Sequence, residues 1–323
     1  MARNAHGPGG SVAGRVSPST RHPVDPSTYL PPMPTPSVVL VTGASTGFGR
    51  LIAETLARHG YRTFATMRDA QGRNAPRAAE IHALAEREKI PLSVLELDVT
   101  SDAGVERCVE MVIDQAGRVD VVVNNAGYGV MGMTEASPID QVQRIFDTNV
   151  LGAMRVNRAV LPHMRRQRSG LLIHITSGAG RVVVPAMGLY CASKWALEAI
   201  SETYRYELAT FGVDSVVIEP GAYPTAVFGN LEKPADAARE AEYGDVAKLG
   251  DRVFKVLTAS KGDPQEIADA VLATIRTPFG ERKARQRVSS STGVDGINAL
   301  NDLSAQLQKQ LIAGFGLADI TTS

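Results

Sequence analysis

The chain has 323 residues, 44% of them hydrophobic, which is enough to bury the core of one large domain or two small ones. Thirty-four basic residues balance thirty-four acidic ones, so neither a nucleic acid nor an anionic membrane is expected as the main partner. The two cysteines, Cys108 and Cys191, lie far apart without metal-ligand spacing, which argues against disulfides and a metal site and favours a reducing, cytoplasmic compartment.

The first 36 residues hold eight of the eighteen prolines, with Gly, Ser and Thr between them. This composition cannot bury a core and predicts a disordered leader over residues 1–36. It contains no apolar run long enough for a signal peptide or a membrane span, so neither export nor anchoring is indicated. Met33 stands just before the first predicted strand, which leaves open both a start at that methionine and a functional tail.

From residue 37 onward, short β-branched runs alternate with stretches of helical period. This alternation is typical of a parallel sheet covered by helices on both faces. Strands are predicted over 38–41, 62–67, 92–97, 119–123, 171–175, 213–218 and 285–288. Helices are predicted over 48–58, 102–116, 138–165, 187–211 and 264–275. Because no internal repeat or second linker is found, residues 37–323 are expected to form a single α/β domain.

A glycine-rich segment follows the first predicted strand and opens into a helix; it reads Thr42-Gly43-Ala44-Ser45-Thr46-Gly47-Phe48-Gly49. Glycine permits a turn with positive φ, close approach of the backbone to a pyrophosphate, and tight packing of helix on strand. The N–H groups at the helix start would then face the anion. The segment is therefore predicted to hold the phosphates of a dinucleotide.

Two other patterns compete with this interpretation. Residues 43–47 match the G-x-S-x-G elbow of a hydrolase, but such an elbow follows several strands and needs a late histidine, whereas the last histidine here is His174. Residues 127–132 form a G-x-G-x-x-G from which no amphipathic helix opens, so a glycine-rich loop is expected there.

The T-G-x-x-x-G-x-G pattern of residues 42–49 resembles the cofactor loop of the short-chain dehydrogenases/reductases. Further motifs of that family follow in the same order: D-V at 98–99, N-N-A-G at 124–127, N-V-L-G at 149–152, I-T-S at 175–177, Y-C-A-S-K at 190–194 and P-G at 220–221. The subgroup most resembled contains 17β-hydroxysteroid and retinol dehydrogenase-like members. The resemblance implies a Rossmann-type, doubly wound parallel sheet and an enzyme that interconverts an alcohol and a ketone or aldehyde by hydride transfer.

The resemblance also implies a catalytic tetrad of Asn149, Ser177, Tyr190 and Lys194. Tyr190 would act as general acid and base, and the Lys194 ammonium, one helical turn on, would favour the tyrosinate and hold the nicotinamide ribose. Ser177 would hydrogen-bond the substrate oxygen, and Asn149 would bend its helix and bind a water. Taken separately, Tyr190 and Lys194 could be an ordinary surface pair, and Ser177 and Asn149 could cap a strand end and a turn. Their joint position at the carboxyl ends of successive strands favours an active site.

The choice between NAD(H) and NADP(H) depends on which residue stands at the end of the second predicted strand. An acidic residue there would select NAD(H). Met67 stands there with Arg68 beside it, and a guanidinium suits a 2′-phosphate, so NADP(H) is favoured. NAD(H) stays open because Arg68 could instead pair with Asp69. The residues expected around the cofactor are Gly43, Ser45, Thr46, Gly47, Phe48, Gly49, Arg68, Asp98, Val99, Asn124, Asn125, Ala126, Gly127, Tyr190, Lys194, Pro220 and Gly221.

Residues 222–250 lack periodicity and are predicted to form a mobile substrate loop. Their apolar side chains, such as Tyr223, Phe228 and Leu231, indicate an apolar alcohol or carbonyl substrate. By resemblance a homodimer or homotetramer is expected. The alternative function is a catalytically silent, nucleotide-sensing regulatory protein on the same fold, but such proteins usually lack the tyrosine and lysine that are present here. A nucleotide-sugar isomerase or dehydratase would call for T-G-x-x-G-x-x-G and a larger carboxyl-terminal domain.

Overall fold

A computed structural model of the chain describes residues 37–225, 229–289 and 294–317. The predicted leader over 1–36 and Phe228 of the substrate loop lie outside the described residues. Seven strands form one sheet in the order β3-β2-β1-β4-β5-β6-β7, and every neighbouring pair is parallel. The strands are β1 (Val38–Val41), β2 (Arg62–Met67), β3 (Leu92–Glu96), β4 (Val121–Asn124), β5 (Gly170–Ile175), β6 (Val213–Pro220) and β7 (Arg285–Val288).

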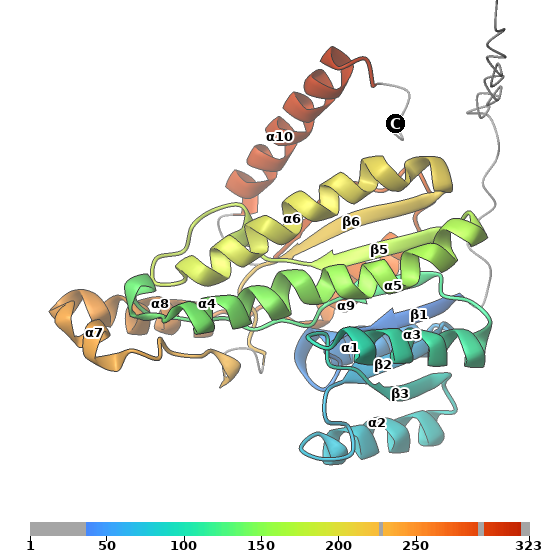
Figure 1. Cartoon of the computed structure of the whole chain (residues 1–323), viewed down its shortest axis with the longest axis horizontal. Helices are drawn as coiled ribbons and strands as arrows, with labels where there is room; N and C mark the ends of the chain where they lie inside the picture. Colours follow the sequence, from blue (N-terminus) through green and yellow to red (C-terminus); the bar gives the residue numbers. More distant parts are fainter. Residues whose placement is uncertain (1–36, 226–228, 290–293, 318–323) are drawn as a thin grey trace, which may run out of the picture. The chain divides into compact units, whose positions relative to one another are not determined.

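Helices connect the strands and cover both faces of the sheet (Figure 1). The helices of the described residues are α1 (Gly47–Arg58), α2 (Ala75–Glu88), α3 (Asp102–Ala116), α4 (Ile139–Phe146), α5 (Gly152–Gln167), α6 (Gly188–Leu208), α7 (Ala237–Glu242), α8 (Leu249–Thr258), α9 (Gln265–Arg276) and α10 (Val294–Gly314), of which α10 follows the last strand. This is the predicted doubly wound α/β fold. Each connection between parallel strands needs such a crossover, which places the carboxyl ends of all the strands at one edge of the sheet.

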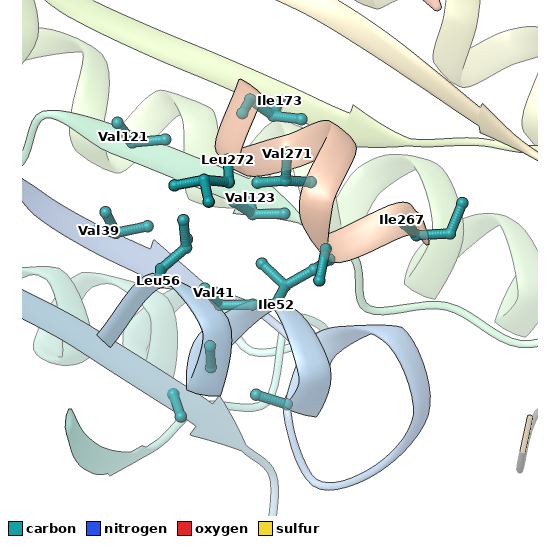
Figure 2. Packing of buried hydrophobic residues seen from close by; sticks show 14 of the residues in the cluster. Val39, Val41, Ile52, Leu56, Val121, Val123, Ile173, Ile267, Val271 and Leu272 are labelled. Atoms are coloured by element: carbon teal, nitrogen blue, oxygen red, sulfur yellow. The ribbon is translucent and has the colours of Figure 1, made fainter. Parts of the chain in front are cut away.

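Alternate side chains of each strand enter two separate core layers. Val39 and Val41 of β1 pack with Ile52 of α1 and Val271 of α9, as Figure 2 shows. The next residue along the strand, Leu40, packs in the opposite layer, against α3 and α5. Because both faces are covered, β1 is hydrophobic throughout and its four residues are at most 3% exposed.

Three sequence expectations differ from the structure. The helix predicted over 138–165 is interrupted by a π-helical turn at Asp147–Leu151, between α4 and α5. The 222–250 segment, which was expected to form a mobile substrate loop, contains α7 and the start of α8. Helices α2 and α10 were not predicted. Across the described ranges, no helix has both the length and the apolar character needed to cross a bilayer.

Candidate active site

The loop between β1 and α1 has a backbone that requires glycine at two positions. Gly43 has φ +66° and Gly47 has φ +57°, in the left-handed region. A Cβ atom on Gly43 would lie 2.8 Å from Cα of Ala126, so this loop and the loop after β4 pack backbone to backbone. The Thr46 side chain, at the N-cap of α1, makes no hydrogen bond to the helix. The first turn of α1 can therefore offer its N–H groups to an anion.

Thr42 joins the two loops at the point where the strand order reverses. Its Oγ1 accepts hydrogen bonds from the backbone N–H groups of Asn125 and Ala126, each at 3.0 Å. The Asn125 side chain in turn donates to the carbonyl oxygens of Thr42, at 2.9 Å, and Gly43, at 3.1 Å. Open α/β sheets bind their ligands at such a reversal. Thr42 begins the glycine motif but was not among the residues predicted around the cofactor.

The loop after β4 continues to the predicted tetrad through Gly127. A Cβ atom on Gly127 would lie 3.0 Å from Oδ1 of Asn149 and 3.6 Å from Nζ of Lys194. Asn149 lies in the π turn, and its side chain bonds both backbone groups of Tyr128, accepting from the N–H at 3.0 Å and donating to the carbonyl at 2.8 Å. The bend that Asn149 was expected to introduce is thus a π turn whose central side chain fixes the neighbouring loop.

Ser177, Tyr190 and Lys194 come together at the carboxyl end of β5. The Ser177 hydroxyl accepts from the N–H of Ala179 at 3.1 Å, and it lies near enough to the Tyr190 side chain to oppose the rise in its pKa. The Lys194 ammonium lies 5.7 Å from the centre of the Tyr190 ring and donates to the carbonyl of Ile175 at 2.9 Å. Together with Asn149, these side chains form a contiguous polar group beside the glycine loop.

Burial dominates the ionisation of this group. It raises the pKa of Tyr190 to about 12, while the hydrogen bond from Ser177 acts in the opposite direction. Desolvation is therefore the largest effect on the Tyr190 pKa, and the stabilisation of the tyrosinate by Lys194 stays a prediction. Burial also lowers the pKa of Lys194 to about 8, and the negative charge of Glu198 opposes that shift.

His174 lies on β5, fully buried behind the tetrad. Burial, with a smaller contribution from the Lys194 charge, lowers the pKa of this imidazole to about 3. Its Nδ1 lies 3.5 Å from the Asn124 side-chain amide, and its Nε2 has no hydrogen-bond partner among the described residues. The ring is therefore neutral at physiological pH.

The end of β2 presents a free guanidinium. Arg68 is exposed and makes no ion pair within the described ranges. The Asp69 carboxylate instead accepts a hydrogen bond from the backbone N–H of Arg73 at 2.9 Å. The alternative in which Arg68 pairs with Asp69 was therefore wrong.

Other residues predicted around the cofactor differ in the contacts that they make. Pro220 ends β6 at the same edge of the sheet, and Gly221, which follows it, donates its N–H to the carbonyl of Val288 at 2.8 Å. Val99 is buried, and a Cβ atom on Gly152 would lie 2.7 Å from it. Asn124 differs, because its side-chain amide donates to Oδ1 of Asn157 in the core, at 2.8 Å, and does not bond the glycine loop.

An apolar cluster adjoins Tyr190. It contains the buried side chains Met131, Ala179, Met187 and Cys191, with Val184, Tyr190, Leu231, Val253 and Leu257 packed against them. A Cβ atom on Gly129 would lie 2.7 Å from Cδ2 of Leu231 and 3.5 Å from Cδ2 of Tyr190. Two backbone hydrogen bonds of 2.9 Å join Glu232, the residue after Leu231, to Gly129 and Met131. One side of Tyr190 is therefore lined by apolar side chains.

The sequence is similar to a large group of known enzymes. A family model described as short chain dehydrogenase matches residues 37–236. Retinol dehydrogenase 8 from Homo sapiens is 33% identical over 291 residues, which cover 86% of this chain and 90% of that protein. The 17-beta-hydroxysteroid dehydrogenase type 1 of Mus musculus is 34% identical over 313 residues, which cover 89% of each protein.

A solved structure is similar over most of its length. The alcohol dehydrogenase from the archaeon Thermococcus sibiricus, complexed with 5-hydroxy-NADP, matches with a TM-score of 0.63 and 28% identity. The match covers 78% of this chain and 95% of that one. The observed sheet is thus the same kind of fold that holds a nicotinamide dinucleotide in that protein.

Proposed function

The chain belongs to the short-chain dehydrogenase family, as its motifs predicted, and from this premise we propose that Tyr190 is the general acid and base of its reaction. The protein is an oxidoreductase that acts on CH–OH groups. The proposed reaction interconverts an apolar alcohol and its ketone or aldehyde, with NADP(H) as the preferred cofactor. The observation that carries the proposal is the Tyr190 side chain beside Ser177, with the Lys194 ammonium 5.7 Å from the centre of its ring.

The residues around the glycine loop fit a nicotinamide dinucleotide. A pyrophosphate requires close approach of the backbone and free N–H groups at a helix start. Gly43 has no room for a Cβ atom, and the N-cap side chain of α1 makes no hydrogen bond to the first turn of that helix. Gly43 to Gly49 would hold the pyrophosphate, the loop from Asn125 to Gly127 would follow the ribose, and Lys194 would bond it. When bound, the cofactor supplies or accepts the hydride at the carbon that carries the oxygen.

In the direction of reduction, the Tyr190 hydroxyl donates its proton to the carbonyl oxygen, and the Ser177 hydroxyl donates a hydrogen bond to the same oxygen. A tyrosine whose pKa is raised by burial is fully protonated at neutral pH, so it is ready for this role. In the direction of oxidation Tyr190 must first lose its proton, and a positive charge on Lys194 then stabilises the tyrosinate. The alkaline range therefore suits oxidation and the neutral range suits reduction.

Arg68 supports the preference for NADP(H). It is exposed at the end of β2 and unpaired within the described residues, so its guanidinium can meet a 2′-phosphate without first breaking an ion pair. The relative from Thermococcus sibiricus was solved with an NADP derivative, which agrees with this preference.

Two broader proposals accompany this function. We expect a homodimer or homotetramer, as the family resemblance implies. We also keep the cytoplasm as the proposed compartment, because Cys108 and Cys191 are both free and buried, as thiols in a reducing environment are.

The test is a panel of apolar ketones, aldehydes and alcohols assayed with NADPH and NADH by nicotinamide absorbance. We expect turnover by the wild type and a loss of about 10²–10⁴-fold in kcat for Tyr190→Phe, which keeps the ring and removes the proton. Tyr206→Phe, on the same helix, is the matched control and should keep wild-type rates. Full turnover by Tyr190→Phe would refute the assigned role, and dinucleotide binding without turnover of any compound would favour the regulatory alternative.

A further inference from the structure

Two side chains from the carboxyl-terminal part of the chain bridge two loops of the proposed active site. One is Arg287 of β7, and the other is Asn301 of α10. Each of them contacts both the short turn at residues 178–181, which follows Ser177, and the end of β6. Neither residue is among those that the sequence predicted for the site.

The guanidinium group of Arg287 makes the first bridge. Arg287 lies opposite Glu219 in the pairing of β6 with β7, and its Nη1 donates to the Glu219 carbonyl oxygen at 3.0 Å. Its Nη2 would lie 3.3 Å from a Cβ atom on Gly221. A Cβ atom on Gly178 would lie 2.7 Å from Nη1, 2.9 Å from Cζ and 3.1 Å from Nη2. One planar group therefore contacts the turn and the end of β6 at once.

The side-chain amide of Asn301 makes the second bridge, and this residue is 9% exposed. Its Oδ1 accepts a hydrogen bond from Nε of Arg181, the last residue of the turn, at 2.8 Å. Its Nδ2 donates to Oε2 of Glu219, also at 2.8 Å. Because the Glu219 side chain is buried, this donor satisfies a carboxyl oxygen that water does not reach. Both ends of one amide thus tie α10 to the two loops that Arg287 also joins.

The turn carries Ser177 with it. It is one 3₁₀ turn, Gly178–Gly180, and Ser177 is its N-cap. The Ser177 carbonyl accepts from the N–H of Gly180 at 2.8 Å, and its hydroxyl accepts from the N–H of Ala179 at 3.1 Å. A turn of three residues that contains two glycines has little stability of its own. Its place, and with it the place of the Ser177 hydroxyl, therefore depends on what packs against it.

We propose that Arg287 and Asn301 are positioning residues, which hold the Ser177 hydroxyl at a fixed distance from the cofactor. The cofactor would lie beside the end of β6, and the two side chains tie the turn to that end. This inference rests on the proposed role of Ser177, which must bond the substrate oxygen while the reacting carbon faces the cofactor. A displacement of about 1 Å from the productive geometry can lower a rate about 100-fold.

The first test is a double-mutant cycle of Arg287→Met and Ser177→Ala, read in the single-turnover rate of ketone reduction. Methionine keeps the length of the side chain and removes the planar group. We expect Arg287→Met to lower the rate about tenfold while the Kd for NADPH stays within about twofold of the wild type. In the Ser177→Ala background the same change should lower the rate less than about twofold, because the positioned hydroxyl is absent. Losses that multiply in the double variant would overturn the proposal.

Arg282→Met is the matched control for stability. Arg282 is also a buried arginine beside β6, but it lies 3.4 Å from Asp214, at the opposite end of that strand, and donates to the carbonyl of Thr274 at 3.0 Å. This variant should lose stability and keep a rate within about twofold of the wild type. An equal loss of rate in Arg282→Met and Arg287→Met would assign the effect to stability and overturn the proposal. Asn301→Leu, which removes the second bridge at similar volume, should lower the rate as Arg287→Met does.

A second measurement does not depend on turnover. Amide hydrogen exchange reports how firmly the turn is held, since the N–H of Gly180 exchanges when its bond to Ser177 opens. We expect residues 178–181 to exchange about tenfold faster in Arg287→Met than in the wild type or in Arg282→Met. Equal exchange in all three proteins would contradict the proposal. Absence of turnover by the wild type would refute the proposed function instead, and the exchange rates would still decide whether Arg287 holds the turn.

Discussion

The side-chain amide of Asn149 donates to the hydroxyl of Ser193 at 3.0 Å, which ties the π turn to the helix that carries Tyr190 and Lys194. Ser193 in turn donates to the carbonyl of Tyr190 at 2.8 Å. Since the same amide also bonds Tyr128, one buried side chain holds α6 and the loop after β4 at a fixed separation.

Asn149→Ala should destabilise the protein and its site together. Three hydrogen bonds are lost, at about 1 kcal/mol each, and buried backbone groups of Tyr128 lose partners, so we expect a loss of about 2–4 kcal/mol in the free energy of unfolding. Ser193→Ala keeps both Tyr128 bonds and should cost about 1–2 kcal/mol. Urea denaturation of both variants checks this order, and an equal loss would contradict the assigned role of the Tyr128 bonds.

Gly43→Ala should weaken dinucleotide binding at least tenfold. The new Cβ atom would meet Ala126 at 2.8 Å, and the positive φ adds about 1–2 kcal/mol of strain. Gly60→Ala is the control, because Gly60 has φ +83° but no atom within 4 Å of a Cβ position. Both variants should lose stability, and only Gly43→Ala should lose affinity in a fluorescence titration with NADPH. Unchanged affinity in Gly43→Ala would exclude this loop from the binding site.

Arg68→Asp should reverse the cofactor preference. The substituted carboxylate would repel a 2′-phosphate and could accept hydrogen bonds from a free ribose, so the ratio of kcat/KM for NADPH over NADH should fall at least tenfold. Arg73→Asp changes the charge equally at another exposed position nearby and should leave the ratio close to the wild-type value. If both variants shift the ratio alike, the effect is one of general charge and not of recognition by Arg68.

His174 should make the protein less stable in mild acid. Its pKa is about 3 in the folded protein and near 6.5 ordinarily, so the unfolded chain binds a proton that the folded protein excludes. Stability present above pH 6.5 is therefore lost as the pH falls toward 3, by about 2 kcal/mol at pH 5. The free energy of unfolding, measured by urea denaturation at several pH values, should lack this part of its fall in His174→Gln. In His82→Gln, at an exposed position, the fall should be kept. An identical pH dependence in the wild type and His174→Gln would contradict the lowered pKa of His174.

The sequence predicted the parts of the site that depend on local pattern. The glycine spacing after β1 and the Tyr190–Lys194 pair could be read directly, because a phosphate loop and a helical turn impose fixed residue spacings. The strands were predicted nearly to their ends, since strands buried on both faces are continuously hydrophobic.

What the sequence could not predict arises from contacts distant along the chain. The π turn at Asn149 depends on bonds to Tyr128 and Ser193, and no local pattern contains them. The raised pKa of Tyr190 comes from burial, which no short stretch of sequence reveals. Helix α10 was missed because its buried face mixes Ile297, Asn301 and Ile312 while Leu303 and Leu307 are exposed, which inverts the usual amphipathic pattern.

The contact between Gly129 and Leu231 limits how the substrate specificity of this protein can be re-engineered. Any side chain introduced at 129 would occupy the place that Leu231 already fills, 2.7 Å from the added Cβ atom. A substitution at 129 alone therefore requires Leu231 to move. A larger residue at 129 should be better tolerated when Leu231 is also shortened, for example to alanine, so variant libraries gain by changing the two positions together.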